Sequence, residues 1–172
     1  MSFFQSFFQN IYGVLFRPTA TLKYLGINYS PSLILQAVLI LLLVALINND
    51  EASSFSIVNY LVSWLIVSSL IFLIAFIFKL RISDYPRFLV MLAFANLPFM
   101  FLAPVGIISQ ASSIISGFLN LIIMTWAFNL NLIAISQCCE ITKVRALLIY
   151  LLPPLILTLL LVKFFFSLFA LI

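Results

Sequence analysis

Residues 57–78 have the sequence IVNYLVSWLIVSSLIFLIAFIF, which contains no charged side chain. A helix needs about 20 mostly apolar residues to cross the hydrocarbon core of a bilayer, and four further stretches meet this requirement. The five predicted spans cover residues 31–48, 57–78, 88–108, 114–138 and 144–163. Their continuous apolar character differs from the alternation typical of a membrane β-strand. The sequence therefore predicts an all-α, polytopic membrane protein with five transmembrane helices.

The composition excludes a water-soluble protein. Of the 172 residues, 66% are hydrophobic and 7% are charged, whereas soluble domains contain about 45–50% apolar and about 25% charged residues. The eight Lys and Arg residues are spread along the chain and form no basic stripe of the kind that binds nucleic acid. The segments between the spans are too short for a separate domain, so residues 1–172 are expected to form a single membrane domain.

The positive charges predict the orientation. Seven of the eight Lys and Arg residues lie before the first span or around the second and fourth connecting loops. The first loop contains Asp50 and Glu51, and the third contains no charge. The positive-inside rule then places the N-terminus in the cytoplasm. Lys163 follows Arg145 by a helical length of about 27 Å, which is close to a hydrocarbon thickness, and is expected near the opposite face.

Residues 1–29 form a cytoplasmic amphipathic segment. Apolar residues recur there at steps of three and four, with Gln5, Ser6, Gln9 and Asn10 opposite them. The apolar positions are Phe3, Phe4, Phe7, Phe8, Ile11 and Leu15. The predicted amphipathic helix either lies flat in the cytoplasmic interface or packs against the bundle. The apolar tail after Lys163 either continues the fifth helix or folds into the outer interface.

The residues needed for common catalytic and metal chemistry are missing. The chain has no His, which excludes histidine-based metal sites and imidazole acid–base catalysis. It also has no Gly-rich phosphate loop and no paired carboxylates. We therefore expect no enzyme activity, no catalytic or metal site and no cofactor. The adjacent Cys138 and Cys139 are either inert residues at a helix end or acceptors for palmitoylation.

Amides and prolines inside the spans are the main polar features. Asn96 and Asn129 are predicted about 13 Å and about 16 Å from the cytoplasmic edge, which predicts a contact between the third and fourth helices. Such amides form interhelical hydrogen bonds, worth about 0.6 kcal/mol each, or line a path for a solute; we favour the hydrogen bonds. Pro98 and Pro104 interrupt the third helix, and Pro153-Pro154 lies inside the fifth. These prolines mark kinks or, alternatively, a broken-helix transport site.

Three segments of the chain resemble the Yip family of membrane proteins, named for interacting with Rab-type GTPases. One contains Arg17 and Pro18 before the first span, and one is Phe94-Ala95-Asn96-Leu97-Pro98, with Phe94 at the place of the family's tyrosine. The third runs from Trp126 to Leu147 and ends in a short basic loop. The candidate interaction or structural residues are Arg17, Pro18, Phe94, Asn96, Pro98, Asn129, Lys143 and Arg145.

The resemblance implies a compact, mostly bacterial-type branch of that family, in a bacterial-type cytoplasmic membrane or an internal membrane. Val14 and Arg17 replace the Asp and Gly that eukaryotic members have before the first span, and binding of Rab-type GTPases is not carried over. We predict a non-enzymatic protein that associates with other integral membrane proteins or with lipids in membrane organisation, trafficking or complex assembly. The alternative is a small-solute transporter or channel.

Overall fold

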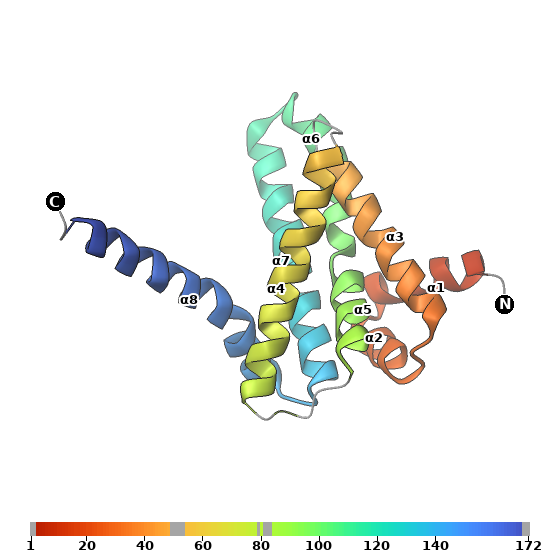
Figure 1. The fold of residues 1–172 in the computed structure, drawn as a ribbon. Coiled ribbons are helices and arrows are strands. Elements are labelled where there is room, and N and C mark those ends of the chain that lie inside the picture. The colour runs from red at the N-terminus through yellow and green to blue at the C-terminus, as the bar shows by residue number, and fades with distance from the viewer. Residues whose placement is uncertain (1–2, 49–53, 79, 81–83, 170–172) are drawn as a thin grey trace.

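A computed structural model describes residues 3–48, 54–78, 80 and 84–169, and the described residues are almost entirely helical (Figure 1). The prediction of an all-α membrane fold is confirmed. The elements are α1 (Phe3–Phe16), α2 (Pro18–Ile27), α3 (Pro31–Asn48), α4 (Ser54–Ile77), α5 (Tyr85–Ala95), the 3₁₀ helix η1 (Leu97–Phe101), α6 (Leu102–Ser109), α7 (Ser113–Cys138) and α8 (Lys143–Phe169).

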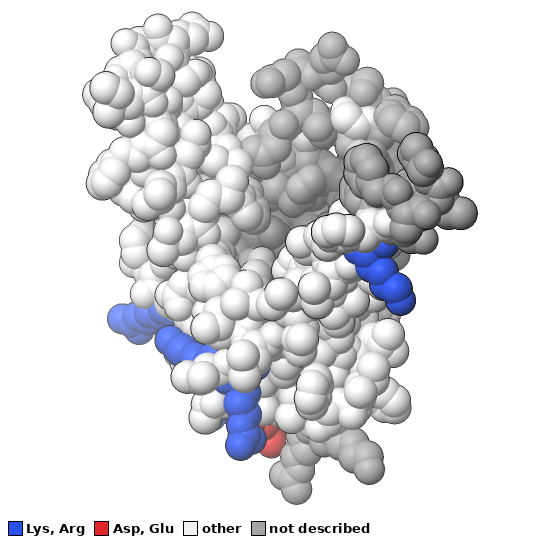
Figure 2. All heavy atoms as spheres, turned by 90° about the vertical axis from the view of Figure 1, so that its left-hand side faces the viewer, with Lys and Arg blue, Asp and Glu red and all other residues white. Residues whose placement is uncertain are grey.

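Helices occupy all five predicted spans. Among the described residues, four segments are long and apolar enough to cross a membrane: α4, the α5–η1–α6 segment, α7 and α8. The first predicted span is the shorter apolar helix α3. That α3 crosses the bilayer and that the N-terminus is cytoplasmic both stay predictions. In Figure 2 the Lys and Arg side chains visible on the face shown lie mainly toward the lower end of the molecule, with one at about mid-height.

The interrupted segment α5–η1–α6 forms the core of the bundle. Of its apolar stretch, 61% is buried, against 39% for α7, 22% for α4 and 18% for α8. Every residue from Met91 to Pro98 is buried, and α5 packs against α3 and α7. The predicted break occurs at Pro98, but Pro104 lies in the first turn of α6 and breaks nothing. A proline is tolerated there because first-turn N–H groups have no helical partner.

The N-terminal segment forms two helices, α1 and α2, and not the single amphipathic helix that its apolar repeat predicts. Arg17 leaves the helical conformation, with φ −136° and ψ 57°, and Pro18 starts α2. Proline disfavours the helical conformation of the residue before it and is well suited to a first helical position.

The amphipathic face of α1 packs partly against the bundle, and its placement in the membrane interface stays a prediction. Phe7, Val14 and two residues of α2 are buried against the bundle. A second row of aromatic side chains faces outward, each more than 60% exposed. This exposed aromatic row consists of Phe4, Phe8, Tyr12 and Phe16. Interfacial amphipathic helices commonly carry phenylalanine on the face that meets the lipid.

A buried glutamine joins α1 to α3. Gln36 is 1% exposed although it lies within the apolar helix α3. Its Nε2 donates to the Ser6 hydroxyl at 3.0 Å, and its Oε1 accepts from Asn10 Nδ2 at 2.9 Å. The polar residues of α1 thus satisfy an amide that would otherwise be buried without partners.

Helix α8 leaves the bundle halfway along its length. Its first half packs against α4 and α7, with Ala146, Ile149 and Pro153 buried. After Pro153, every side chain that the structure describes is exposed, and the helix extends away from the bundle (Figure 1). The expected continuation of the fifth helix beyond Lys163 is present, because α8 runs to Phe169.

The close approach of α1 and α2 depends on Gly13. A Cβ atom added at Gly13 would lie 2.6 Å from Thr21 Oγ1 and 2.8 Å from its Cγ2. Gly13→Ala should therefore destabilise the protein by about 1–3 kcal/mol through overpacking and lower its thermal unfolding midpoint in detergent. Gly117→Ala is the control, since no atom would lie within 4 Å of its Cβ. A Gly13→Ala midpoint equal to that of Gly117→Ala would contradict the packing.

Removal of the Gln36 amide should weaken the attachment of α1. Gln36→Leu deletes two side-chain hydrogen bonds, worth about 1 kcal/mol each. We expect a lower thermal unfolding midpoint and faster proteolytic cleavage within α1. The matched control is Gln9→Leu. Gln9 lies on α1, the helix to which Gln36 is hydrogen-bonded, and its side chain is exposed. Identical proteolysis of the two variants would show that the amide does not hold α1.

Candidate functional site

The side chain of Asn96 forms a hydrogen bond to the backbone where the helix is interrupted between α5 and η1. The Asn96 N–H bonds to the Ala93 carbonyl at 3.1 Å, and the Phe99 N–H bonds to the Asn96 carbonyl at 3.0 Å, so the chain changes to three-residue spacing. Asn96 Nδ2 donates to the Leu92 carbonyl at 2.8 Å. This side-chain bond takes the place of the helical N–H that the change of spacing withdraws. A break in the backbone is therefore tolerated inside an apolar span.

A mainly apolar cleft of about 420 Å³, with several polar side chains in its walls, lies beside the interruption. Its walls come from α4, the α5–η1–α6 segment, α7 and α8. The polar side chains that line it are Tyr60, Ser63, Ser68, Asn96, Asn131 and Tyr150. An adjoining depression of about 550 Å³ shares Phe99, Asn131 and Tyr150 with it and extends along α7 past Phe128. We call these two hollows together the membrane cleft.

The predicted contact between Asn96 and Asn129 is replaced by a different pair. Asn96 and Asn131 are buried and line the same cleft, whereas Asn129 is exposed and lines a separate shallow depression with Thr125 and Trp126. Residues two positions apart on a helix point about 200° apart around its axis. Depth in the membrane alone does not distinguish the two asparagines.

Asn131 uses only its nitrogen within the described part of the chain. Its Nδ2 donates to the Ala127 carbonyl at 2.9 Å, as Asn96 Nδ2 does to Leu92. Among the described residues, no donor reaches the amide oxygen of either side chain. Within the described part of the chain, these two acceptors in the cleft therefore remain available to a donor.

The other candidate residues lie outside the membrane cleft. Phe94 is fully buried in the core, and Pro98 is the second residue of η1. Arg17, Lys143 and Arg145 are exposed, while Pro18 starts α2. Sequence reasoning missed Asn131 as a cleft residue, as well as Ser68 and Tyr150. The signal for Asn131 was present in its helical position opposite Asn129.

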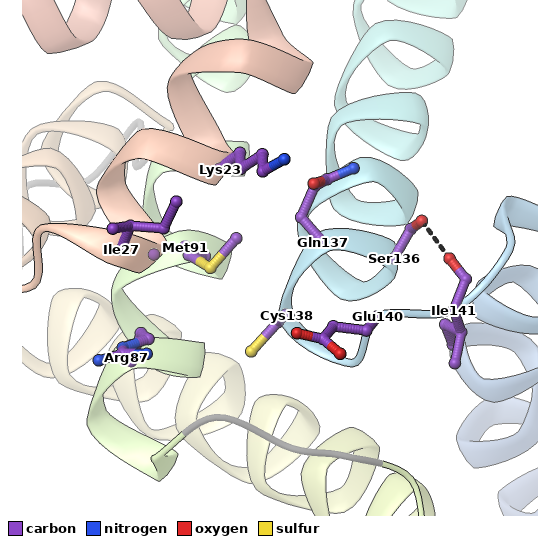
Figure 3. Close-up of a pocket in the computed structure, with 10 residues that line it drawn as sticks. Lys23, Ile27, Arg87, Met91, Ser136, Gln137, Cys138, Glu140 and Ile141 are labelled. Atoms are coloured by element: carbon purple, nitrogen blue, oxygen red, sulfur yellow. Dashed lines mark hydrogen bonds between the residues drawn. The ribbon is translucent and has the colours of Figure 1, made fainter.

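A second hollow of about 610 Å³ lies at the predicted cytoplasmic end, between α2, α5 and the end of α7 (Figure 3). We call it the end pocket. It contains Lys23 and Arg87 on one side and Glu140 on the other. Glu140 has a positive φ of 53° in the turn between α7 and α8. Within the described residues, no group of three His, Cys, Asp or Glu side chains could hold a metal ion.

The two cysteines are buried at the end pocket. Cys138 is 5% exposed and lines the pocket, and Cys139 is 1% exposed. A hydrogen bond with Cys138, and then burial, raise the pKa of the Cys139 thiol well above its ordinary value. A thiol with a raised pKa is less often a thiolate, which is the reactive form. This environment favours inert structural residues over accessible acceptors for acylation.

The Cys139 thiol should react slowly with alkylating reagents. A raised pKa lowers the thiolate fraction at every pH below it, so alkylation at pH 8 should be at least about tenfold slower than for an exposed thiol with a pKa of about 8.5. The rate should continue to rise above pH 9. The control is Gln110→Cys in a Cys138→Ser, Cys139→Ser background, because residue 110 is exposed. Equal alkylation rates for the native and control thiols at pH 8, with both rates levelling near pH 9, would show that the pKa of the native thiol is not raised.

Comparison with known proteins identifies the family of the chain. No curated protein and no solved structure gives a significant match. The model of the Yip1 domain family matches residues 12–165. The match begins within α1 and ends in the exposed half of α8, so it includes both hollows. The chain belongs to the Yip1 domain family of membrane proteins.

Proposed function

We propose that this protein is a non-enzymatic membrane protein that acts by association with other membrane proteins, and that the membrane cleft receives a transmembrane helix of a partner. The supporting observation is the pair of amide oxygens of Asn96 and Asn131 in an open cleft within the predicted spans. Lipid chains have no donors for these oxygens. A helix with hydroxyl or amide side chains supplies such donors, as polar residues do between membrane helices.

The exposed apolar surface does not by itself support a partner, since lipid covers such surface as well as protein does. The arrangement of α8 is more informative. Tyr150 lines the cleft just before α8 leaves the bundle at Pro153, so the cleft lies where α8 separates from α4 and α7. Such a separation provides room for an additional helix beside the polar side chains.

A second copy of this chain is a poorer occupant than a different protein. The exposed half of α8 is the helix that another copy would most readily offer. Its described side chains after Pro154 are apolar except for Thr158 and Lys163. The Thr158 hydroxyl already donates to the Pro154 carbonyl at 2.7 Å. Lys163 is then the remaining side-chain donor among the described residues of that surface, and it lies ten residues beyond Pro153, away from the cleft.

One observation favours a second candidate function, the transport of a small solute. The helix is interrupted beside buried amides, which is the arrangement that broken-helix transporters use for their binding sites. Transport would require the cleft to open to each side of the membrane in turn. Flux into liposomes that contain the wild-type protein, abolished by Asn131→Leu, would favour this alternative over a docking role.

Photo-crosslinking tests the docking role directly. A benzophenone amino acid is introduced at Phe128, which lines the cleft, or at Phe118, which is 65% exposed elsewhere on α7. In native membranes, the probe at residue 128 should give one discrete protein adduct heavier than this chain by the mass of a partner. The probe at residue 118 should give only lipid adducts.

A matched pair of substitutions tests whether the amides recognise the partner. Asn131→Leu should reduce the residue-128 adduct by about tenfold, whereas Asn120→Leu, at an exposed position on the same helix, should leave it unchanged. An adduct with the mass of two copies of this chain would show that the cleft binds a second copy and not a different protein. Equal adducts at residues 118 and 128, or insensitivity to Asn131→Leu, would overturn the docking role.

A further inference from the structure

The end pocket combines opposite charges with an apolar floor. Lys23 comes from α2 and Arg87 from the first turn of α5, and Glu140 lies across the pocket from both (Figure 3). Ile27, Met91 and Ile141 supply apolar surface to the same hollow, and only part of it is open to the outside. A volume of about 610 Å³ lies within the range of about 300–1,000 Å³ typical of small-molecule sites.

Arg87 has a buried donor that the described residues do not satisfy. Its Nε atom is buried and has no hydrogen-bond partner among them. The guanidinium lies over the Tyr29 ring, with its central carbon 5.9 Å from the ring centroid, and this contact orients the group without using its N–H donors. Most buried polar atoms in proteins have a partner, so the hydrogen-bonding capacity of the Arg87 side chain is not fully used within the described residues.

The pair of cations specifies the chemistry of a ligand for this pocket. The guanidinium offers N–H donors in a planar fork that matches a phosphate group, and a lysine ammonium adds a mobile charge. Glu140 has the opposite effect, because it repels a ligand with further negative charge and attracts an amine. A phosphodiester linked to an ammonium group satisfies both sides of the pocket.

The position of the pocket favours a lipid as the source of this group. It is lined in part by α2, which directly follows α1, and the exposed aromatic row of α1 is typical of a helix that lies in a membrane interface. Lipid phosphates are found at that depth. Ile27 is 66% exposed and also lines the pocket, which gives an apolar surface on which an acyl chain can continue from the headgroup.

We propose that the end pocket binds the headgroup of an amine-containing phospholipid, with its phosphate on Arg87 and Lys23 and its ammonium toward Glu140. This site is separate from the membrane cleft and involves none of the cleft residues. Its occupancy would also attach α2 to the end of α7. The lipid would therefore stabilise the region where the N-terminal helices join the bundle.

Native mass spectrometry of the purified full chain in detergent tests the proposal by titration with phosphatidylethanolamine or phosphatidylglycerol. Wild type should bind phosphatidylethanolamine more tightly. Arg87→Gln and Lys23→Gln should each weaken this binding by about tenfold, the scale of one charge-assisted hydrogen bond. Lys143→Gln removes one charge from the same end outside the pocket and should bind as wild type does. Glu140→Gln should reverse the preference between the two lipids.

Unfolding midpoints without lipid separate loss of the site from loss of the fold. If Arg87→Gln unfolds, Arg87→Lys retains the charge without the fork and should show intermediate affinity. Equal or tighter binding of phosphatidylglycerol by wild type would overturn the assignment of the ammonium to Glu140. Equal effects of Lys143→Gln and Lys23→Gln would show that the lipid binds through general surface charge and not through the pocket. Inorganic phosphate and soluble phosphoethanolamine should protect the protein against unfolding less than the intact lipid does. Equal protection would overturn the assignment of a lipid as the ligand.

Discussion

The requirement that backbone polar groups be paired inside a membrane governs the centre of this fold. The α5–η1–α6 segment is the most buried apolar stretch of the described chain and is also the one that is interrupted. The bond from Asn96 Nδ2 to the Leu92 carbonyl makes these two properties compatible, since the segment supplies its own replacement donor. The helices α3 and α7 can then pack against a continuous core, and the cleft forms at the point where the repair occurs.

The sequence predicts the helices well because apolar length and charge position are one-dimensional properties. All five predicted spans coincide with helices, and the helix boundaries follow the polar connecting segments. The rotation of a helix about its axis is a different matter. Asn129 and Asn131 differ by only about 3 Å in depth, yet one is exposed and the other is buried in the cleft. Only the packing of α7 against α5 and η1 decides which asparagine faces inward.

The N-terminal segment shows the same division between local and tertiary information. Its apolar repeat predicts helix correctly, and Pro18 is a local signal for the break that the repeat obscures. The role of Gln36 depends instead on two segments distant in sequence. A glutamine within an apolar helix requires partners once it is buried, and α1 supplies them through Ser6 and Asn10. The partners become identifiable only when α1 lies across α3.

The two hollows differ in chemistry because the cost of charge depends on depth. Ionised side chains are expensive in the hydrocarbon core, and the polar groups among the apolar residues that line the membrane cleft are accordingly amides, hydroxyls and phenols. The end pocket contains the charged residues Lys23, Arg87 and Glu140. Such charges have a low desolvation cost only near the membrane surface. Recognition of a partner in the cleft then depends on hydrogen bonds. Each contributes little binding energy but requires a donor in a defined position. Recognition in the end pocket depends on charge, so salt should weaken ligand binding there and leave association in the cleft almost unchanged.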